Sequence, residues 1–152
     1  MPNRLAVIDA DRCVGCQVCM FACARWQGAG GVGRSRIGVQ SAGGMEHGFK
    51  VIVCRGCEDP PCARVCPTDA LRLRKGGGVV LNEARCIGCR NCQEACTLGA
   101  VYWDDHDEKP MICIHCGTCA EYCPHGVLAL EPFDKLTTAD AGAVVEEAPS
   151  GR

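Results

Sequence analysis

Sixteen cysteines constrain this 152-residue chain more than any other feature of its sequence. They form four groups of four, and no cysteine lies outside these groups. Three groups share the spacing C-x2-C-x2-C-x3-C, whereas the second group has four residues in its middle gap. In chain order the groups are Cys13, Cys16, Cys19 and Cys23; Cys54, Cys57, Cys62 and Cys66; Cys86, Cys89, Cys92 and Cys96; and Cys113, Cys116, Cys119 and Cys123. This internal repeat is the unit from which the fold is built.

The cysteines are expected to bind metal rather than to form disulfides. The N-terminus does not have the pattern of a secretory signal, and no run of about 18 apolar residues could span a membrane. We therefore expect a cytoplasmic protein with no nucleic-acid partner, although export on a partner's twin-arginine signal stays open. Disulfides are rare in the cytosol. Only 5% of the residues are aromatic, so metal ligation is also expected to supply folding energy that a thin apolar core does not.

The spacing within each group predicts a [4Fe–4S] cluster. Three thiolates two residues apart can ligate three irons of one cubane, and the fourth, on the following helical turn, ligates the other cluster of a pair. Structural zinc needs two cysteine pairs brought together, not quartets built on triplets. Loss of a ligand usually precedes a [3Fe–4S] cluster, and no ligand is missing here. The sequence thus predicts four [4Fe–4S] clusters with all sixteen cysteines as iron ligands.

The residue after the last cysteine differs among the groups. Proline stands there in the second and fourth groups, as Pro67 and Pro124, whereas the first and third groups have Ala24 and Thr97. Proline is not a ligand, so we expect altered local rigidity at Ala24 and Thr97 and no lost cluster.

Residues 5–130 resemble the ferredoxin-type subunit that accompanies formate dehydrogenases, sulfoxide reductases, hydrogenases and aldehyde oxidoreductases. The most specific signature is the second group, in which Pro60 and Pro61 occupy the wide gap. Residues 41–49 and 113–130 are most similar to the small subunit associated with tungsten-containing aldehyde oxidoreductases. The resemblance implies an α+β, ferredoxin-like fold of two pseudo-symmetric two-cluster modules, with short β-hairpins, short helices and a core dominated by cofactors.

The pairing of the groups is left open by the spacing alone, which also allows group one with two and three with four. Residues 67–85, predicted as a helix end, strand Leu71–Arg74, a glycine turn and strand Val79–Leu81, resemble the connection inside a two-cluster bacterial ferredoxin. The resemblance therefore implies a nested pairing, two with three and one with four. The implied ligand sets are Cys13, Cys16, Cys19 and Cys123; Cys54, Cys57, Cys62 and Cys96; Cys86, Cys89, Cys92 and Cys66; and Cys113, Cys116, Cys119 and Cys23.

The nested pairing predicts one four-cluster domain, residues 1–130, followed by a tail, residues 131–152, that is mobile alone or docks on a partner. The expected parts of the domain are an inner half of about 50–100, an outer half of 1–30 plus 101–130, and a hairpin insertion of 31–53. The insertion is predicted as a hairpin because residues 36–39 and 49–53 alternate as strands do.

Other conspicuous residues are expected to be structural. The pattern G-x-G-x-x-G at residues 28–33 does not join a strand to a helix in a βαβ unit, so a flexible loop is expected. Trp26 and Trp103 are expected to cover a cluster or an interface.

The sixteen thiolates make histidine ligands unnecessary, so the histidines are expected on the surface, with hydrogen bonds to a cluster as the alternative for His115 and His125. The four histidines are His47, His106, His115 and His125.

Charge predicts unequal reduction potentials. The formal net charge of −2 becomes about −10 when each of four clusters with its four thiolates adds −2. Basic residues gather around the second group, and acidic residues gather in the link before the fourth group. The basic residues are Arg55, Arg64, Arg72, Arg74 and Lys75, and the acidic ones are Asp104, Asp105, Asp107 and Glu108. The highest potential is therefore expected at Cys54–Cys66.

These features predict a non-catalytic electron carrier. No Ser/His/Asp arrangement, carboxylate pair or phosphate loop is visible, so substrate chemistry is expected on another polypeptide. The resemblance implies an anaerobic complex with a large tungsten- or molybdenum-cofactor subunit, foremost an aldehyde oxidoreductase, and a flavin/NAD-linked subunit or ferredoxin as acceptor. The alternatives are a formate dehydrogenase or hydrogenase subunit and a free soluble polyferredoxin. Clusters near opposite surfaces would also allow head-to-tail self-association.

Overall fold

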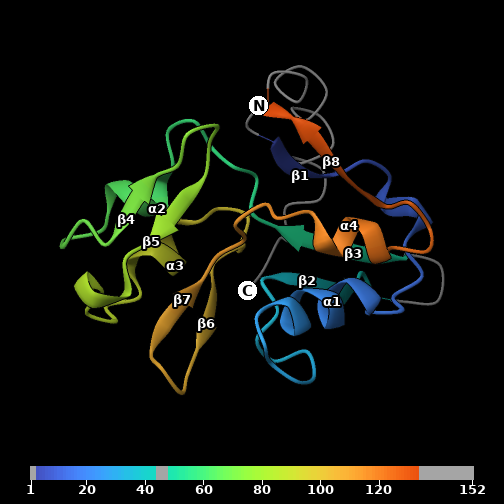
Figure 1. Cartoon of the computed structure of the whole chain (residues 1–152), viewed down its shortest axis with the longest axis horizontal. Coiled ribbons are helices and arrows are strands. Elements are labelled where there is room, and N and C mark those ends of the chain that lie inside the picture. Colours follow the sequence, from blue (N-terminus) through green and yellow to red (C-terminus); the bar gives the residue numbers. More distant parts are fainter. Residues whose placement is uncertain (1–2, 44–47, 134–152) are drawn as a thin grey trace.

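The computed structural model describes residues 3–43 and 48–133 (Figure 1). Within these residues the fold is mixed α+β, as predicted, with four two-stranded antiparallel sheets and four short α-helices. The strands are β1 (Asn3–Val7), β2 (Ile37–Ser41), β3 (Phe49–Val53), β4 (Leu71–Leu73), β5 (Val79–Leu81), β6 (Tyr102–Asp104), β7 (Lys109–Met111) and β8 (Leu128–Pro132). The helices are α1 (Val18–Trp26), α2 (Pro61–Arg64), α3 (Asn91–Ala95) and α4 (Thr118–Tyr122), with 3-10 turns η1 (Ala10–Arg12) and η2 (Glu83–Arg85). None of these helices has the length and apolar character needed to cross a membrane.

The outer half joins the two ends of the described chain. Strand β1 pairs antiparallel with β8, from Asn3 opposite Pro132 to Val7 opposite Leu128. Helix α1 packs against α4, and both lie on the right of Figure 1. Since α1 carries part of the first cysteine group and α4 part of the fourth, this half brings together the two groups that are farthest apart in the sequence.

The inner half contains the second and third groups. Helix α2 packs against α3, and the β4–β5 hairpin lies beside them on the left of Figure 1. The hairpin pairs Leu71 with Leu81 and turns through Gly76, Gly77 and Gly78, all of which have positive φ. A run of left-handed residues of this kind suits glycine, because a Cβ would clash there. The predicted strand–turn–strand is therefore confirmed, with β4 ending one residue earlier than expected.

The predicted hairpin insertion is built into the core of the outer half. Strands β2 and β3 pair antiparallel from Ile37 opposite Val53 to Ser41 opposite Phe49, and residues 44–47 of their loop lie outside the described residues. Ile37, Val51 and Val53 are buried in one apolar cluster with Leu5 and Leu128. The hairpin therefore supports the cysteine loops of this half rather than standing apart from them.

Two boundaries differ from those expected. Val101 and Ile112, which flank the β6–β7 hairpin, are buried against Leu71 and Val79, so this hairpin packs on the inner half. The reason is burial, since the apolar residues at its base cover the β4–β5 hairpin. Strand β8 extends to Pro132, two residues into the segment predicted as a tail, because it completes the ladder with β1. The rest of that segment, from residue 134, lies outside the described residues.

Cysteines form part of both apolar cores. Cys19, Cys113 and Cys119 are buried in the outer cluster, and Cys62 and Cys92 in the inner one. In each half the same side chains thus fill the core and present thiols to its centre. The predicted metal ligands therefore also determine how the surrounding chain packs.

Candidate iron–sulfur cluster sites

Each cysteine group lies on a loop that leads into a short helix, and left-handed residues shape that loop. In the first C-x2-C gap these residues are Gly15, Gly56, Gly88 and His115, with φ between 58° and 71°. A second left-handed residue precedes α1, α3 and α4, namely Gln17, Arg90 and Gly117. Successive left- and right-handed residues turn backbone N–H groups toward the inside of a loop, which forms a concave site for negatively charged groups. In the second group Pro60, in an extended conformation, stands before α2 instead.

The structure brings cysteines from distant groups into shared cavities. Cys123 lines one cavity together with Cys13, Cys16 and Cys19. Cys96 lines a second cavity together with Cys54, Cys57 and Cys62. In the described part of the chain, no three His, Cys, Asp or Glu side chains converge tightly enough for a single metal ion. The cysteines instead surround a larger space, which suits a cubane whose four ligands each hold a different iron.

The structure brings the cysteines of the other two implied ligand sets only partly together. Burial and the thiols of Cys23, Cys19 and Cys116 raise the pKa of Cys119 to about 12. Cys23 from α1 thus lies beside the fourth group.

In the third group, burial raises the pKa of Cys92 to about 11, with the thiols of Cys89 and Cys86 adding to the shift. Cys66 packs against the same apolar cluster as Cys92. The described contacts thus place Cys66 in the core of this half but do not join it directly to Cys86 or Cys89.

The two halves also meet through cysteines. Cys113 is almost fully buried, and after burial the neighbouring thiol that contributes most to raising its pKa is Cys54. Cys19 similarly lies near Cys119. The four groups therefore follow one another through the molecule in the order first, fourth, second and third.

The sulfurs of the fourth cysteines accept hydrogen bonds from backbone amides. Ala70, Ala100 and Val127 donate to Cys66, Cys96 and Cys123 at 3.3, 3.4 and 3.4 Å, and each donor lies four residues after its cysteine. Burial acts to raise the pKa of Cys66, but the N–H groups of Leu71, Thr68 and Ala70 lower it overall. Such donors stabilise a thiolate, which is the form that ligates iron. The donor set therefore fits [4Fe–4S] clusters.

Cys23 differs from the other three. Its sulfur accepts from the backbone N–H of Arg36 at 3.3 Å and from the side-chain amide of Gln27 at 3.4 Å. Gln27 was not singled out in the sequence, although it stands four residues after Cys23, where the other groups place their backbone donor.

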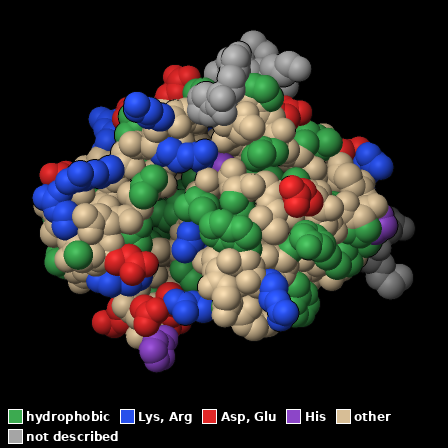
Figure 2. All heavy atoms as spheres, in the orientation of Figure 1, with side chains coloured by type: hydrophobic (Ala, Val, Ile, Leu, Met, Phe, Trp, Pro, Cys, Tyr) green, Lys and Arg blue, Asp and Glu red, His purple; other side chains and the backbone are tan. Residues whose placement is uncertain are grey.

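Positive charge gathers around the second group, partly as predicted. Burial raises the pKa of Cys54 to about 11, and Arg74 is among the groups that oppose this rise. Burial also raises the pKa of Cys57, with Arg55 and Arg4 opposing it. Arg4 comes from β1, so a reading of the neighbouring sequence could not have found it. Figure 2 shows Lys and Arg side chains concentrated over this half of the visible face.

Two arginines also tie the halves together. Arg4 donates to the carbonyl oxygen of Arg55 at 3.0 Å, and Arg74 donates to that of Ile114 at 2.9 Å. Arg64, by contrast, forms an exposed ion pair with Asp59. Only part of the predicted basic cluster therefore faces the second group.

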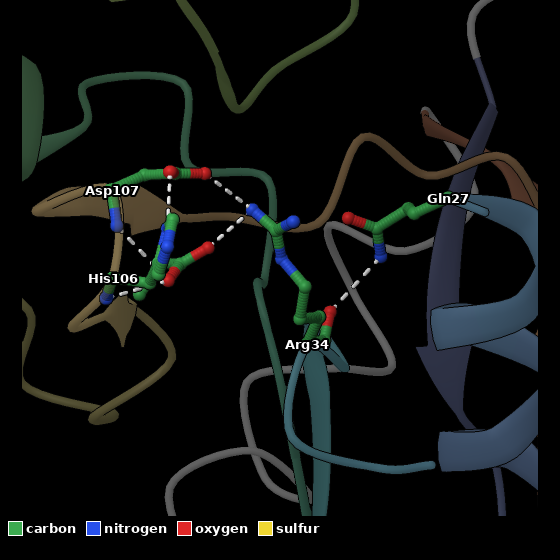
Figure 3. Close-up of polar contacts among 5 residues, drawn as sticks. Gln27, Arg34, His106 and Asp107 are labelled. Carbon is green, nitrogen blue, oxygen red and sulfur yellow. Dashed lines mark hydrogen bonds and ion pairs between the residues drawn. The ribbon is translucent and has the colours of Figure 1, made fainter. Parts of the chain in front are cut away.

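The acidic link lies beside the third group and not, as expected, beside the fourth. Asp105 pairs with Arg90 at 3.0 Å, and the backbone of Glu108 contacts Gly88. Asp104 and Asp107 both bind the guanidinium of Arg34, and Figure 3 shows the pair with Asp107. The link is the turn of the β6–β7 hairpin, which carries these carboxylates away from the fourth cysteine loop.

His115 contradicts the expectation of a surface histidine. Its side chain is buried, and its Nδ1 accepts a hydrogen bond from the N–H of Leu5 at 3.1 Å. Burial lowers its pKa to about 4, with Arg74 and Arg4 adding to the effect. The ring packs against Gly56 and Gly78, because the left-handed turn between Cys113 and Cys116 directs it into the junction of the halves.

The other histidines give a mixed result. His106 is exposed as expected, and His125 is half-buried. His47 lies outside the described residues.

Residues 28–33 are a turn and loop after α1 with no strand before them, which confirms the structural interpretation of their glycine pattern.

Helices α1 and α4 carry an exposed aromatic groove on their outer side. Val18, Phe21, Trp26 and Tyr122 line it and are 36%, 52%, 54% and 61% exposed. Figure 2 shows hydrophobic side chains gathered over this half of the molecule. Exposed apolar surface of this kind is typical of an interaction site.

Trp103 has a different position. It packs on the inner apolar cluster, with Arg90 over its ring at 4.4 Å. It therefore covers the core of the inner half.

The cysteine loops, shared cavities and N–H···S bonds define a ferredoxin-type iron–sulfur protein. Residues 45–133 match the 4Fe-4S dicluster domain family, and residues 10–26 match a 4Fe-4S binding domain. The chain therefore belongs to the 4Fe-4S dicluster domain family. Its cofactors are [4Fe–4S] clusters, and sixteen cysteines in ferredoxin-like motifs are the number that four such clusters require.

Several curated relatives are named as subunits of larger enzymes. The chain is 36% identical over 111 residues to the B subunit of anaerobic dimethyl sulfoxide reductase from Escherichia coli, a match that covers 64% of this chain and 54% of the relative. It is 36% identical over 102 residues to formate hydrogenlyase subunit 2 of the same organism, covering 65% and 47%. The chain spans between about half and two thirds of the length of the curated relatives that it matches.

Proposed function

We propose that this chain is the non-catalytic electron-transfer subunit of a molybdenum or tungsten oxidoreductase, and that it relays single electrons through four [4Fe–4S] clusters. The observation that carries the proposal is the continuous series of cysteine groups, in which Cys19 lies near Cys119 and Cys113 near Cys54. When bound, [4Fe–4S] clusters accept and donate one electron at a time, with potentials set by charge, hydrogen bonds and exposure.

The proposed ligand sets are nested. Cys123 completes the set of Cys13, Cys16 and Cys19, and Cys23 completes that of the fourth group. Cys96 and Cys66 are exchanged in the same way between the second and third groups. The two shared cavities and the packing of α1 on α4 and of α2 on α3 support this assignment. With these sets, each half is a pair of sites that exchange their last ligand.

Cysteines at the surface supply the entry and exit of the series. Cys16, Cys89 and Cys116 are exposed, and the groups of Cys16 and Cys89 stand at the two ends of the order. An electron carrier needs its terminal groups near the surface, because its partners must approach them. We therefore propose that one end faces a catalytic subunit and the other end faces the acceptor.

A permanent partner is favoured over a free shuttle by the aromatic groove on α1 and α4. Stable interfaces bury apolar and aromatic side chains, whereas transient electron-transfer contacts are small. The groove lies over the helices that carry Cys19, Cys23 and Cys119. Relatives named as parts of larger enzymes support the same choice.

The finer proposal is a tungsten-containing aldehyde oxidoreductase as the partner enzyme. It is supported by the similarity of residues 41–49 and 113–130 to the small subunit associated with that class. The relatives named for dimethyl sulfoxide and formate enzymes make a molybdenum enzyme the second candidate. Sixteen cysteines in cluster-binding groups, none of them in a disulfide, also favour a reducing compartment, so we propose a cytoplasmic location.

Purification from the native host under strict anaerobiosis tests the proposal. We expect a stoichiometric large subunit that contains tungsten or molybdenum, about 16 Fe per copy of this chain, and activity with an aldehyde. Recovery of a monomer without a metal-containing partner would instead indicate a free polyferredoxin. Phe21→Ser with Trp26→Ser should release the partner while the iron content stays unchanged, and Val80→Ser, at an exposed strand residue of the other half, is the control.

A further inference from the structure

The turn after the first cysteine group has no backbone donor for its fourth sulfur at the usual position. Helix α1 has nine residues, whereas α2, α3 and α4 have four or five, and it continues past Cys23 to Trp26. The N–H of Gln27 is therefore used at the helix end, where it donates to the carbonyl oxygen of Ala24 at 3.1 Å. In the other three groups the amide four residues after the cysteine is free to donate to the sulfur.

The side chain of Gln27 occupies the place of that missing donor. Its Nε2 lies 3.4 Å from the sulfur of Cys23, 3.1 Å from the carbonyl oxygen of Cys23 and 3.2 Å from that of Arg34. All three neighbours are acceptors. The amide nitrogen, which donates two hydrogens, therefore faces them, since an amide oxygen there would meet acceptors only.

The side-chain amide of Gln27 is held in place by α1 on one side and by the loop of Arg34 on the other. Gln27 follows directly on α1, and Figure 3 shows its amide directed at the backbone of Arg34. The Arg34 guanidinium binds Asp104 and, at 2.7 Å, Asp107, so this loop is tied to the β6–β7 hairpin. The half-buried amide is therefore placed by contacts that do not depend on the sulfur itself.

We propose that Gln27 helps to set the reduction potential of the cluster that Cys23 ligates, by donating its side-chain N–H to that sulfur beside the backbone N–H of Arg36. Reduction adds negative charge to the cluster and its thiolates, and an N–H aimed at a ligand sulfur stabilises that charge. The bond therefore raises the potential of this one cluster. The inference rests on the proposed ligand role of Cys23 and adds a positioning residue that acts through it.

Gln27→Leu in the anaerobically reconstituted full chain tests the proposal by potentiometric titration followed by EPR. We expect one couple to move to lower potential and the other three to stay. The ratio of reduced to oxidised cluster at fixed potential should fall by up to about tenfold, which corresponds to about 59 mV for one electron. Gln40→Leu, the same change at an exposed residue of β2, should move no couple. Gln27→Met, which is unbranched like glutamine, should give the same shift if leucine does not fit.

Iron content and a marker variant separate the possible failures. Gln27→Leu with full iron content and four unchanged couples would overturn the inference, as would an equal shift of all four. Cys23→Ser should alter the same couple that moves in Gln27→Leu. If Cys23→Ser leaves the iron content and every couple unchanged, the ligand role of Cys23 is wrong, and the inference falls with it.

Discussion

The sulfur of the last cysteine in each group accepts N–H hydrogen bonds, but the donors after Cys23 differ from those after the other three last cysteines. Helices α2, α3 and α4 end before Cys66, Cys96 and Cys123, and a backbone amide four residues after each cysteine reaches its sulfur. After Cys23 the helix continues, and the sulfur is reached by the Gln27 side chain and by the amide of Arg36, thirteen residues away. The need for N–H donors is thus shared by all four repeats, while the donor depends on where the helix ends.

The backbone at the last cysteines also differs in whether it accepts a proline at the next residue. Cys123 precedes Pro124 and has φ −73° and ψ 110°, and Cys96 has nearly the same values, −76° and 108°, although Thr97 follows it. An extended residue of this kind is what proline requires before it. Ala24 is fully buried inside α1, where proline would break the helix. The helix therefore excludes proline at Ala24, whereas the backbone before Thr97 would accept it.

The largest expected effect concerns which cluster each last cysteine ligates. Cys23→Ala with Cys116→Ala should remove one cluster and lower the iron content from about 16 to about 12 per chain, because both residues are proposed ligands of one site. Cys23→Ala with Cys16→Ala should alter two clusters by one ligand each, which leaves about 14 Fe if both become [3Fe–4S] and about 8 if both are lost. Iron and sulfide analysis together with EPR after anaerobic reconstitution counts the altered clusters. Two altered clusters in Cys23→Ala with Cys116→Ala, and one in Cys23→Ala with Cys16→Ala, would show that Cys23 ligates the cluster of its own group.

Ala24→Pro should be the most damaging change outside the ligands. It places proline in the interior of α1, where it removes a helical hydrogen bond and clashes with the preceding turn, at a cost of about 3 kcal/mol or more. We expect a large fall in the thermal unfolding midpoint of the holoprotein and loss of the cluster served by Cys23. Ala24→Ser is the matched control, and an unchanged midpoint in Ala24→Pro would show that the helix ends at Cys23 in solution.

Thr97→Pro should be tolerated at the equivalent position of the third group. The backbone of Cys96 already suits a following proline, and proline restricts the unfolded chain, which is worth about 0.4–1 kcal/mol where the native conformation fits. We expect a thermal midpoint equal to or slightly above that of the parent chain, with unchanged iron. A fall as large as that of Ala24→Pro would contradict the proposed equivalence of the third turn with the second and fourth.

The smallest effect concerns pH and the contacts that hold the Arg34 loop. The hydrogen bond to Asp107 raises the pKa of the exposed His106, so this contact stabilises the fold below pH 6.5 and is lost as pH rises through the raised pKa. The pKa of Asp107 is lowered by His106 and Arg34, so its contribution is present above pH 3.8 and is lost as pH falls through the lowered pKa. The thermal midpoint should fall slightly from pH 6 to pH 8, and less so in His106→Ala. An identical slope in both proteins would show that His106 adds nothing.

Much of the site could be predicted because it depends on local spacing. Cysteines two residues apart on a left-handed turn converge whatever surrounds them, so three ligands of each proposed site follow from the sequence. The β4–β5 and β2–β3 hairpins also follow from local alternation and glycine turns. Arg4 and the burial of His115 did not follow in this way, because each depends on contacts with a part of the chain remote in sequence. Gln27 did not follow either, because its contact with Cys23 depends on α1 continuing to Trp26, which the cysteine spacing does not indicate.

By itself the sequence determined that this protein binds cubane clusters and how many ligands it has for them, because thiolate spacing is a property of short segments. Tertiary structure decided which groups lie together, since the pairing of β1 with β8 and of α1 with α4 closes over more than a hundred residues. It also decided the environment of each sulfur. Charge and N–H donors also arrive from other parts of the chain, such as Arg4 on β1 and the backbone N–H of Arg36 just before β2, and these groups are expected to set the potentials.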